Sequence, residues 1–184
     1  DAVVMLEHTN IIEKDMIEVM KQIAPGENII KEDEDIKKGE LIFKRGHRLR
    51  PQDVAALAAL GIIKVNVYRK VTVAIISTGD EIIPPEEPIT SAQVRDTNTF
   101  NLIGLIRELG GIALKKGIVK DNKALLKKVV KEAIQQADIV LITGGSSVGT
   151  RDYTKDVINS LGSPGVLFHG IMIKPGKPLF VGLI

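Results

Sequence analysis

Cysteine and tryptophan are absent from the 184-residue sequence, and aromatic residues make up only 3% of it. A chain without cysteine can form no disulfide bond, no zinc–thiolate site and no cysteine nucleophile, so these classes of site are excluded. The absence also favours a cytoplasmic location, and we expect the protein there.

Long hydrophobic runs and a charge excess of one sign are also missing. The longest apolar runs, residues 71–76 and 139–142, have the length of a strand, and no charged and then apolar leader opens the chain. The 25 Lys and Arg residues nearly balance the 23 Asp and Glu residues, which leaves no broad basic field for a nucleic acid. We therefore expect neither a membrane nor a nucleic acid among the partners.

The hydrophobic content of 44% indicates a globular fold, and its pattern changes after Arg69. Residues 1–69 read as a small β-rich module with one helix, which begins at Pro51, the favoured first helical position, and ends before Gly61. The strands expected in this module cover residues 15–23, 27–30, 40–43 and 62–68. The chain opens without methionine and its last residues read as a strand, so we expect a part of a longer protein.

Residues 70–184 alternate between strand and helix patterns, which predicts an α/β domain with an open, mostly parallel sheet between two helical layers. The β-branched run at 71–77 is typical of a strand buried on both faces. Further strands are expected at 112–119, 138–143, 166–173 and 179–183, and helices at 97–109, 122–137 and 153–161. Such sheets bind ligands beyond the carboxyl ends of their strands.

Acidic residues follow three of these strands at the points where they end. Glu81, Asp121 and Asp152 could converge on one face, and hard carboxylate oxygens together with ligand phosphates are what Mg²⁺ prefers. The sequence therefore predicts a site for a divalent metal at this edge of the sheet.

A glycine- and hydroxyl-rich run at 143–150 precedes the third helix of the α/β domain. Free backbone N–H groups, the helix dipole and hydroxyl groups can all face an anion there, so a phosphate is the expected ligand. The run matches neither the P-loop nor the dinucleotide-binding fingerprint. Lys174 and Lys177, in the Lys-Pro-Gly-Lys segment 174–177, could add two cationic phosphate contacts.

Each of these features also has a purely structural interpretation. Asp121 stands where a helix N-cap would stand, Asp152 falls in a first helical turn, and Asp96 precedes a helix. Residues 174–178 could form an ordinary surface loop. Only the shared location of these residues at the strand ends favours a binding site.

The order of the motifs resembles that of the molybdenum insertases of molybdopterin cofactor synthesis, the MoeA and gephyrin E-domain family. The resemblance is carried by residues 77–81, 96–98, 117–121, 138–149, 152–153 and 174–178, and upstream by residues 1–5, 26–29, 34–36 and 51–61. It therefore covers essentially the whole chain, although the start of the N-terminal region and the C-terminal domain of the family are missing from it.

The resemblance implies that molybdate is inserted into adenylylated molybdopterin and that AMP is released with the help of Mg²⁺. Glu81, Asp121 and Asp152 would then be the catalytic and metal-binding residues. The implied cofactor-binding residues are Thr78, Gly79, Asp80, Asp96, Asn98, Gly144, Gly145, Ser146, Ser147, Gly149, Lys174, Pro175, Gly176 and Lys177. A homodimer that shares the site is also implied, with a molybdopterin adenylyltransferase as a further partner.

Two other functions remain open. The same loops could hold molybdopterin without chemistry, as a binding or scaffold module, or the domain could adenylylate molybdopterin with ATP. The upstream module at 1–69 argues against an adenylyltransferase, because single-domain members of that group lack it.

Overall fold

The computed structural model describes residues 1–144, 150–174 and 176–184, and at residues 150–152 it describes the backbone alone. The chain forms two compact units, Asp1–Val65 and Asn66–Ile184. Each unit has its own secondary structure.

The first unit holds a hairpin and a helix. A 3₁₀ turn, η1 (Leu6–His8), leads into β1 (Thr9–Glu13), which pairs antiparallel with β2 (Met16–Val19). Helix α1 (Pro51–Ala59) begins with proline, as the sequence predicts, because its first N–H needs no partner.

Asp53, 5% exposed, stabilises the start of α1. Its carboxylate accepts the Arg50 backbone N–H at 2.9 Å and the guanidinium of the same residue at 3.0 Å. His47 Nε2 lies 2.9 Å from Oδ2. These hydrogen bonds, with those of Arg50 first, hold the pKa of Asp53 well below its usual range.

Three predictions of strands in this unit are wrong. Residues 27–30 and 40–43 close local turns instead, as in the Glu40 N–H bond to the Lys37 carbonyl at 3.0 Å. Residues 62–68 follow α1 without a strand partner among the described residues. Strand β1 was not expected from the sequence, since its pattern lacks a simple alternation. Extended sequences become strands only when another strand satisfies their backbone groups.

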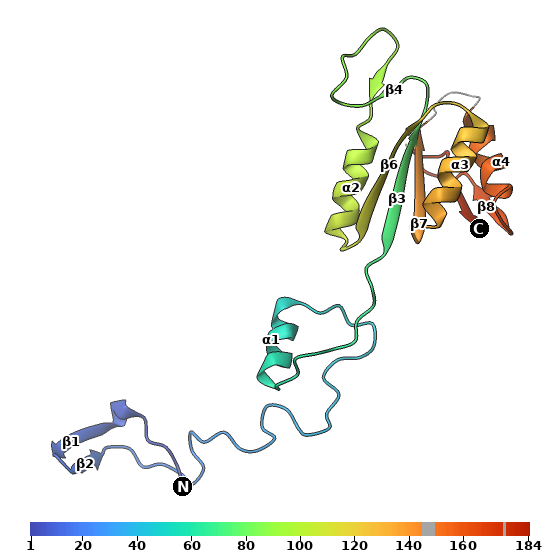
Figure 1. The fold of residues 1–184 in the computed structure, drawn as a ribbon. Helices are drawn as coiled ribbons and strands as arrows, with labels where there is room; N and C mark the ends of the chain where they lie inside the picture. The colour runs from blue at the N-terminus through green and yellow to red at the C-terminus, as the bar shows by residue number, and fades with distance from the viewer. Residues whose placement is uncertain (145–149, 175) are drawn as a thin grey trace. The chain divides into compact units, whose positions relative to one another are not determined.

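The second unit is built on a parallel sheet with the order β6-β3-β7 (Figure 1). The central strand β3 (Thr72–Thr78) pairs with β6 (Ile112–Val119) and with β7 (Ile139–Gly144). Residues 73–78 of β3 are all buried, which confirms the strand predicted from the β-branched run.

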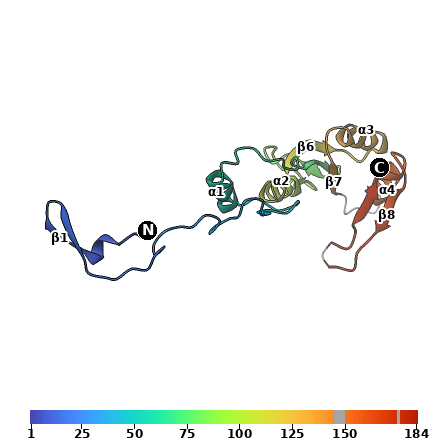
Figure 2. The same ribbon diagram turned by 90° about the horizontal axis from the view of Figure 1, so that it is seen from below.

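Helices cover both faces of this sheet, as predicted. Helix α2 (Asn98–Glu108) lies on one face, where Ile106 packs with Val73 and Ile75. Helices α3 (Lys123–Ile134) and α4 (Thr150–Asn159) lie on the other (Figure 2). The larger core forms there, and its fully or almost fully buried members are Ala74, Ile76, Val119, Leu126, Val130, Ala133 and Val157.

Two short strand pairs lie outside the three-stranded sheet. The parallel pair β4 (Ile82–Ile83) and β5 (Val94–Arg95) connects β3 with α2. The antiparallel pair β8 (Gly165–His169) and β9 (Phe180–Leu183) packs against α4. Strand β8 ends at His169, four residues before the predicted end at residue 173, because the chain turns at Gly170, whose φ is +86°.

Candidate functional site at the carboxyl ends of the parallel strands

The three parallel strands end side by side. Thr78, the last residue of β3, is paired in register with Val119 of β6 and with Gly144 of β7. The Gly79 N–H then donates to the Val119 carbonyl at 3.1 Å. The three loops that follow therefore begin at one edge of the sheet, as the sequence predicts for parallel strands.

Two hydrogen bonds join the loop after β3 to the loop after β6. The Asp121 backbone N–H donates to Oδ1 of Asp80 at 3.1 Å. Lys120 Nζ donates to the backbone carbonyl of Asp80 at 3.0 Å. The loops that carry the acidic residues are thus held together by their own backbone and side chains.

Gly79 lets the acidic loop turn back on itself. Its φ is +149°, and a Cβ at this position would lie 2.9 Å from Oε2 of Glu81. The Glu81 carboxylate therefore lies close above the glycine backbone, in the space where another residue would place its side chain. The φ of +149° explains why glycine precedes Asp80 and Glu81, because residues with a side chain rarely adopt it.

The carboxyl group of Asp121 lies near the carboxylates of Asp80 and Glu81. Burial raises the pKa of its carboxyl group, and the negative charges of Asp80 and Glu81 raise it further. Hydrogen bonds from the Asp80 backbone and the Thr78 side chain oppose the rise. Oδ1 of Asp121 is buried and has no hydrogen-bond partner among the described residues.

These residues fit a divalent cation. A cation would supply the missing partner of Oδ1 and would offset the repulsion among the carboxylates of Asp80, Glu81 and Asp121. Within the described residues, however, no group of three or more His, Cys, Asp or Glu side chains could hold a metal by itself. The side chain of Asp152 lies outside that description, so the predicted triad stays a prediction.

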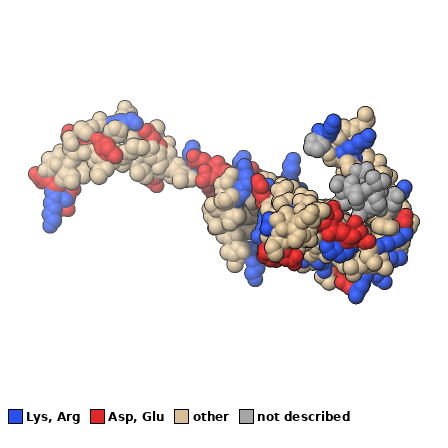
Figure 3. Space-filling model, turned by 90° about the horizontal axis from the view of Figure 1, so that it is seen from above, with Lys and Arg blue, Asp and Glu red and all other residues tan. Residues whose placement is uncertain are grey.

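Acidic side chains gather on the face of the α/β unit seen from above (Figure 3). Some Lys and Arg side chains lie next to them in the same view. A ligand that brings both phosphates and a metal would meet charges of both signs there.

Gly144 ends β7 against the backbone of β3. Its φ is +127°, and a Cβ would lie 1.8 Å from the Thr78 carbonyl oxygen, so no other residue fits. This glycine brings the two strands together where the predicted phosphate loop begins. Gly145, Ser146, Ser147 and Gly149 of that loop, and Pro175, lie outside the described residues.

A buried hydroxyl network supports the strand ends from the α2 side. Ser77 Oγ lies 2.9 Å from Thr99 Oγ1 and 3.2 Å from Thr143 Oγ1, so it links β3 to α2 and to β7. Our sequence analysis missed this network. The signal that could have revealed it is a hydroxyl residue at the end of an otherwise apolar buried strand.

The sequence allows Asp96 and Asp121 each to be explained as a residue that stabilises the start of a helix, and the structure supports this for only one of them. Oδ1 of Asp96 accepts the Thr99 N–H at 3.1 Å, so Asp96 does stabilise the start of α2, and Asn98 is exposed in the first turn. Asp121 is not the cap of α3, because Asn122 accepts the Leu125 N–H at 2.9 Å. Its carboxylate is therefore available for another role.

Lys174, Gly176 and Lys177 lie in the connection between β8 and β9. The Ile171 N–H donates to the Lys177 carbonyl at 3.0 Å, and Gly176 has a φ of +106°. Both lysines are exposed, and in the part of the chain that the structure describes neither forms an ion pair. Among the residues that the structure describes, neither lysine side chain forms a hydrogen bond or an ion pair with residues 79–81 or 120–121.

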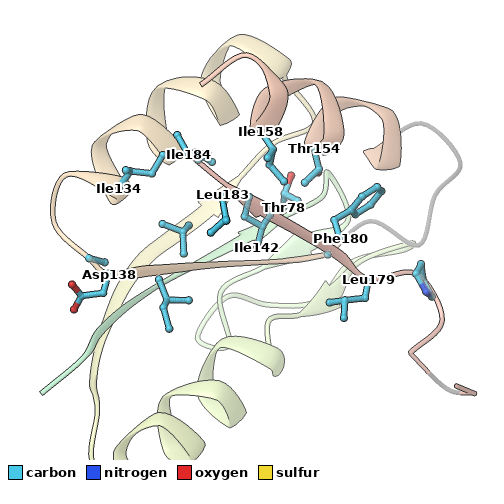
Figure 4. A pocket seen from close by; sticks show the side chains of 17 residues that line it. Thr78, Ile134, Asp138, Ile142, Thr154, Ile158, Leu179, Phe180, Leu183 and Ile184 are labelled. Atoms are coloured by element: carbon cyan, nitrogen blue, oxygen red, sulfur yellow. The ribbon is translucent and has the colours of Figure 1, made fainter. Parts of the chain in front are cut away.

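A cavity of about 430 Å³ lies between β7, α3, α4 and β9 and reaches Thr78 and Gly144 at the strand ends (Figure 4). Ile142, Ile158 and Leu183 contribute to its largely aliphatic lining. It offers space for an apolar group next to the polar loops.

This arrangement defines the class of protein. It is an open α/β binding domain, with an anionic ligand and a cation as the expected occupants of its strand-end loops. Residues 74–184 match the family described as the probable molybdopterin binding domain, and residues 1–61 match the MoeA N-terminal region, domains I and II. The chain belongs to this molybdopterin-binding family of MoeA type.

Among the described residues, no helix has the length and apolar character needed to cross a membrane.

Known relatives agree with the family assignment. The chain is 42% identical to a putative molybdopterin biosynthesis protein of Methanocaldococcus jannaschii, over 100% of this chain and 47% of the relative. It is 39% identical to the molybdopterin molybdenumtransferase of Haemophilus influenzae, over 99% of this chain and 45% of the relative. The chain therefore spans about half the length of the curated relatives it matches.

A solved structure has the same fold. The crystal structure of the molybdopterin biosynthesis MoeA protein from Pyrococcus horikoshii aligns with a TM-score of 0.79 at 41% sequence identity. The alignment covers 100% of this chain and 45% of that chain.

Proposed function

We propose that this chain provides the substrate-binding part of a molybdopterin molybdenumtransferase, which inserts molybdate into adenylylated molybdopterin and releases AMP. One observation carries the proposal. The loops after β3 and β6 are joined through Asp80, and the buried Oδ1 of Asp121, in the second of these loops, has no hydrogen-bond partner among the described residues. A metal ion that binds together with a pyrophosphate linkage would supply the partner for this oxygen.

Mg²⁺, when bound, would neutralise the phosphate oxygens as the bond to AMP breaks. Asp121 and Glu81 would hold it, and Asp152 would be the third ligand. The protein's own part is to orient the pyrophosphate: Gly79 and Gly144 let the chain pack closely against Glu81 and Thr78 at the strand ends, and the joined loops keep the carboxylates in place.

The remaining predicted residues would bind the ends of the substrate. Gly145, Ser146, Ser147 and Gly149 would hold a phosphate ahead of α4, where backbone N–H groups and the helix dipole favour an anion. Lys174 and Lys177, with Pro175 and Gly176 between them, would bind molybdate or a second phosphate. Thr78 lines the strand-end cavity and would contact the ligand there.

The wider assignment belongs to the same proposal. Residues 70–184 would be the molybdopterin-binding domain and residues 1–69 part of the N-terminal region of the enzyme. The working unit would be a cytoplasmic homodimer that receives its substrate from a molybdopterin adenylyltransferase.

Calorimetry and a turnover assay test the proposal on this chain. With Mg²⁺ present, molybdopterin adenylate should bind, and molybdate should trigger AMP release. Asp121→Asn should lower AMP release at least about tenfold, whereas Glu132→Gln, which removes one exposed charge from α3, should not. Equal turnover of wild type and Asp121→Asn would refute the role of this site.

A binding module without chemistry is the second candidate, because the chain spans only about half of its relatives. It predicts tight binding of molybdopterin adenylate without any AMP. An adenylyltransferase would instead consume ATP in the presence of molybdopterin, so the nucleotide that changes separates the two enzymes.

A further inference from the structure

A second cavity, of about 350 Å³, lies on the α2 side of the sheet, between the β4 segment and the edge strand β6. Residues 82–85, two isoleucines followed by two prolines, form its apolar wall together with Ile118. Five charged residues line the same cavity: Asp96, Lys115 and Lys120, and the exposed Glu86 and Glu87. Apolar walls with a few polar groups are typical of a site for a small molecule.

A bulge in β6 forms one side of this cavity. The register between β3 and β6 shifts after the pair Ile75–Lys115, so that Ile76 lies opposite Gly117 and Lys116 is the extra residue. Gly117 has a φ of +93°, which glycine adopts without strain. Bulges of this kind often re-aim side chains beside a binding site.

Asp96 carries the signal for a ligand. Its side chain is almost completely buried, with 4% exposure, and Oδ1 accepts the Thr99 N–H at 3.1 Å. Oδ2 is buried as well but has no hydrogen-bond partner among the described residues. A buried carboxylate oxygen without a donor is unfavourable, and because Asp96 lines the cavity, a donor group of a ligand there would satisfy it.

The two lysines connect the cavity to the site described above. Lys120 Nζ also donates to the Asp80 carbonyl at 3.0 Å, so the cavity adjoins the acidic loop. Lys115 Nζ lies 4.7 Å from the centroid of the Phe100 ring, which holds the ammonium group at the sheet edge. A ligand here would find an acceptor in Asp96 and donors in both lysines.

We propose that this cavity binds the pterin ring of the substrate, with Asp96 as the residue that recognises its N–H edge. This inference rests on the proposed function. A pterin presents adjacent N–H donors beside a carbonyl oxygen, which match the buried carboxylate of Asp96 and the ammonium groups of Lys115 and Lys120. Its flat faces suit the wall formed by residues 82–85 and Ile118. Adenine matches less well, because an acceptor nitrogen stands beside its amino group and would face the carboxylate.

Binding of two separate probes to this chain tests the inference. A soluble fluorescent pterin is titrated by fluorescence anisotropy, and AMP with Mg²⁺ by calorimetry. Asp96→Asn keeps an oxygen for the Thr99 N–H and replaces the other oxygen by a donor, so the cap of α2 persists. This variant should bind the pterin about 10- to 100-fold more weakly and AMP as tightly as wild type does.

The control is Glu86→Gln, which removes one negative charge from an exposed residue that lines the same cavity. It should leave both affinities unchanged. The inference is wrong if Asp96→Asn binds the pterin like wild type, if it weakens AMP equally, or if wild type binds AMP but no pterin. If wild type binds neither the pterin nor AMP, both this inference and the proposed function are wrong. If wild type binds AMP but no pterin, only this inference is wrong.

Discussion

The backbone N–H of Asp121 donates to Oδ1 of Asp80 across 3.1 Å, between residues that lie 41 positions apart in the chain. The carboxylate of Asp80 therefore holds in place the loop that carries the carboxylate of Asp121. The arrangement brings Asp80, Glu81 and Asp121 close enough for their charges to repel. Such repulsion is tolerated where a cation is to bind.

A metal should therefore stabilise the protein through Asp121. Millimolar Mg²⁺ should raise the melting temperature of wild type, because a ligand that binds only the folded state stabilises it. Asp121→Asn removes one of the repelling charges, so without metal it should melt no lower than wild type, and Mg²⁺ should no longer raise its melting temperature. Scanning fluorimetry over a Mg²⁺ titration measures both effects. A Mg²⁺ response that survives in the variant would contradict the site.

Gly144→Ala should destabilise the α/β unit by at least about 3 kcal/mol. The added Cβ would lie 1.8 Å from the Thr78 carbonyl oxygen, and the φ of +127° would be strained for alanine. Chemical denaturation followed by circular dichroism gives the free energy of unfolding. The matched control is Gly104→Ala in the middle of α2, where nothing lies within 4 Å of the new methyl group. That change should stabilise the protein by up to about 1 kcal/mol.

Ser77→Ala should cost about 1 to 3 kcal/mol of unfolding free energy, because it leaves the buried hydroxyl of Thr99 without its partner at 2.9 Å. Removing both partners at once should cost less than the single changes predict, since Ser77→Ala with Thr99→Val leaves no unpaired hydroxyl at this contact. A double-mutant cycle of urea denaturation measures the coupling. Simple additivity of the two changes would show that the contact contributes nothing.

Asp138 should make the α/β unit sensitive to acid. Hydrogen bonds from Arg69 first, and then from the Thr72 backbone at 2.9 Å, lower the pKa of its carboxyl group from 3.8 to about 2. A lowered carboxyl pKa stabilises the folded state above the unfolded value, and this stabilisation is lost as the pH falls from 3.8 to about 2.

Asp138→Asn should therefore be less stable than wild type at pH 7. The difference should shrink between pH 4 and pH 2, because the pKa of Asp138 is 3.8 in the unfolded state and about 2 in the folded state. Melting temperatures across this range provide the measurement. Glu132→Gln, an exposed acid on α3, serves as the control. A gap that stays constant down to pH 2 would be inconsistent with this linkage.

The sequence by itself determined the elements of the α/β unit. The run of β-branched residues in β3 and the apolar stripe of α3 are local signals, and so is the proline at the start of α1 in the first unit. Hydrophobic period and capping act within a few residues, so they can be read without knowing what lies across the fold. The grouping of acidic and glycine-rich loops at one edge follows from parallel strands alone.

Only the tertiary structure decided which groups meet. The tie between Asp80 and Asp121, the hydroxyl contacts of Ser77, and the absence of a strand at residues 62–68 all depend on partners far away in the chain. So do the oxygens of Asp96 and Asp121 that have no hydrogen-bond partner in the described part of the chain, because a carboxylate that could cap a helix or bind a metal looks the same in a sequence. Burial and register are properties of the packed chain, and they determine which of these roles a side chain takes.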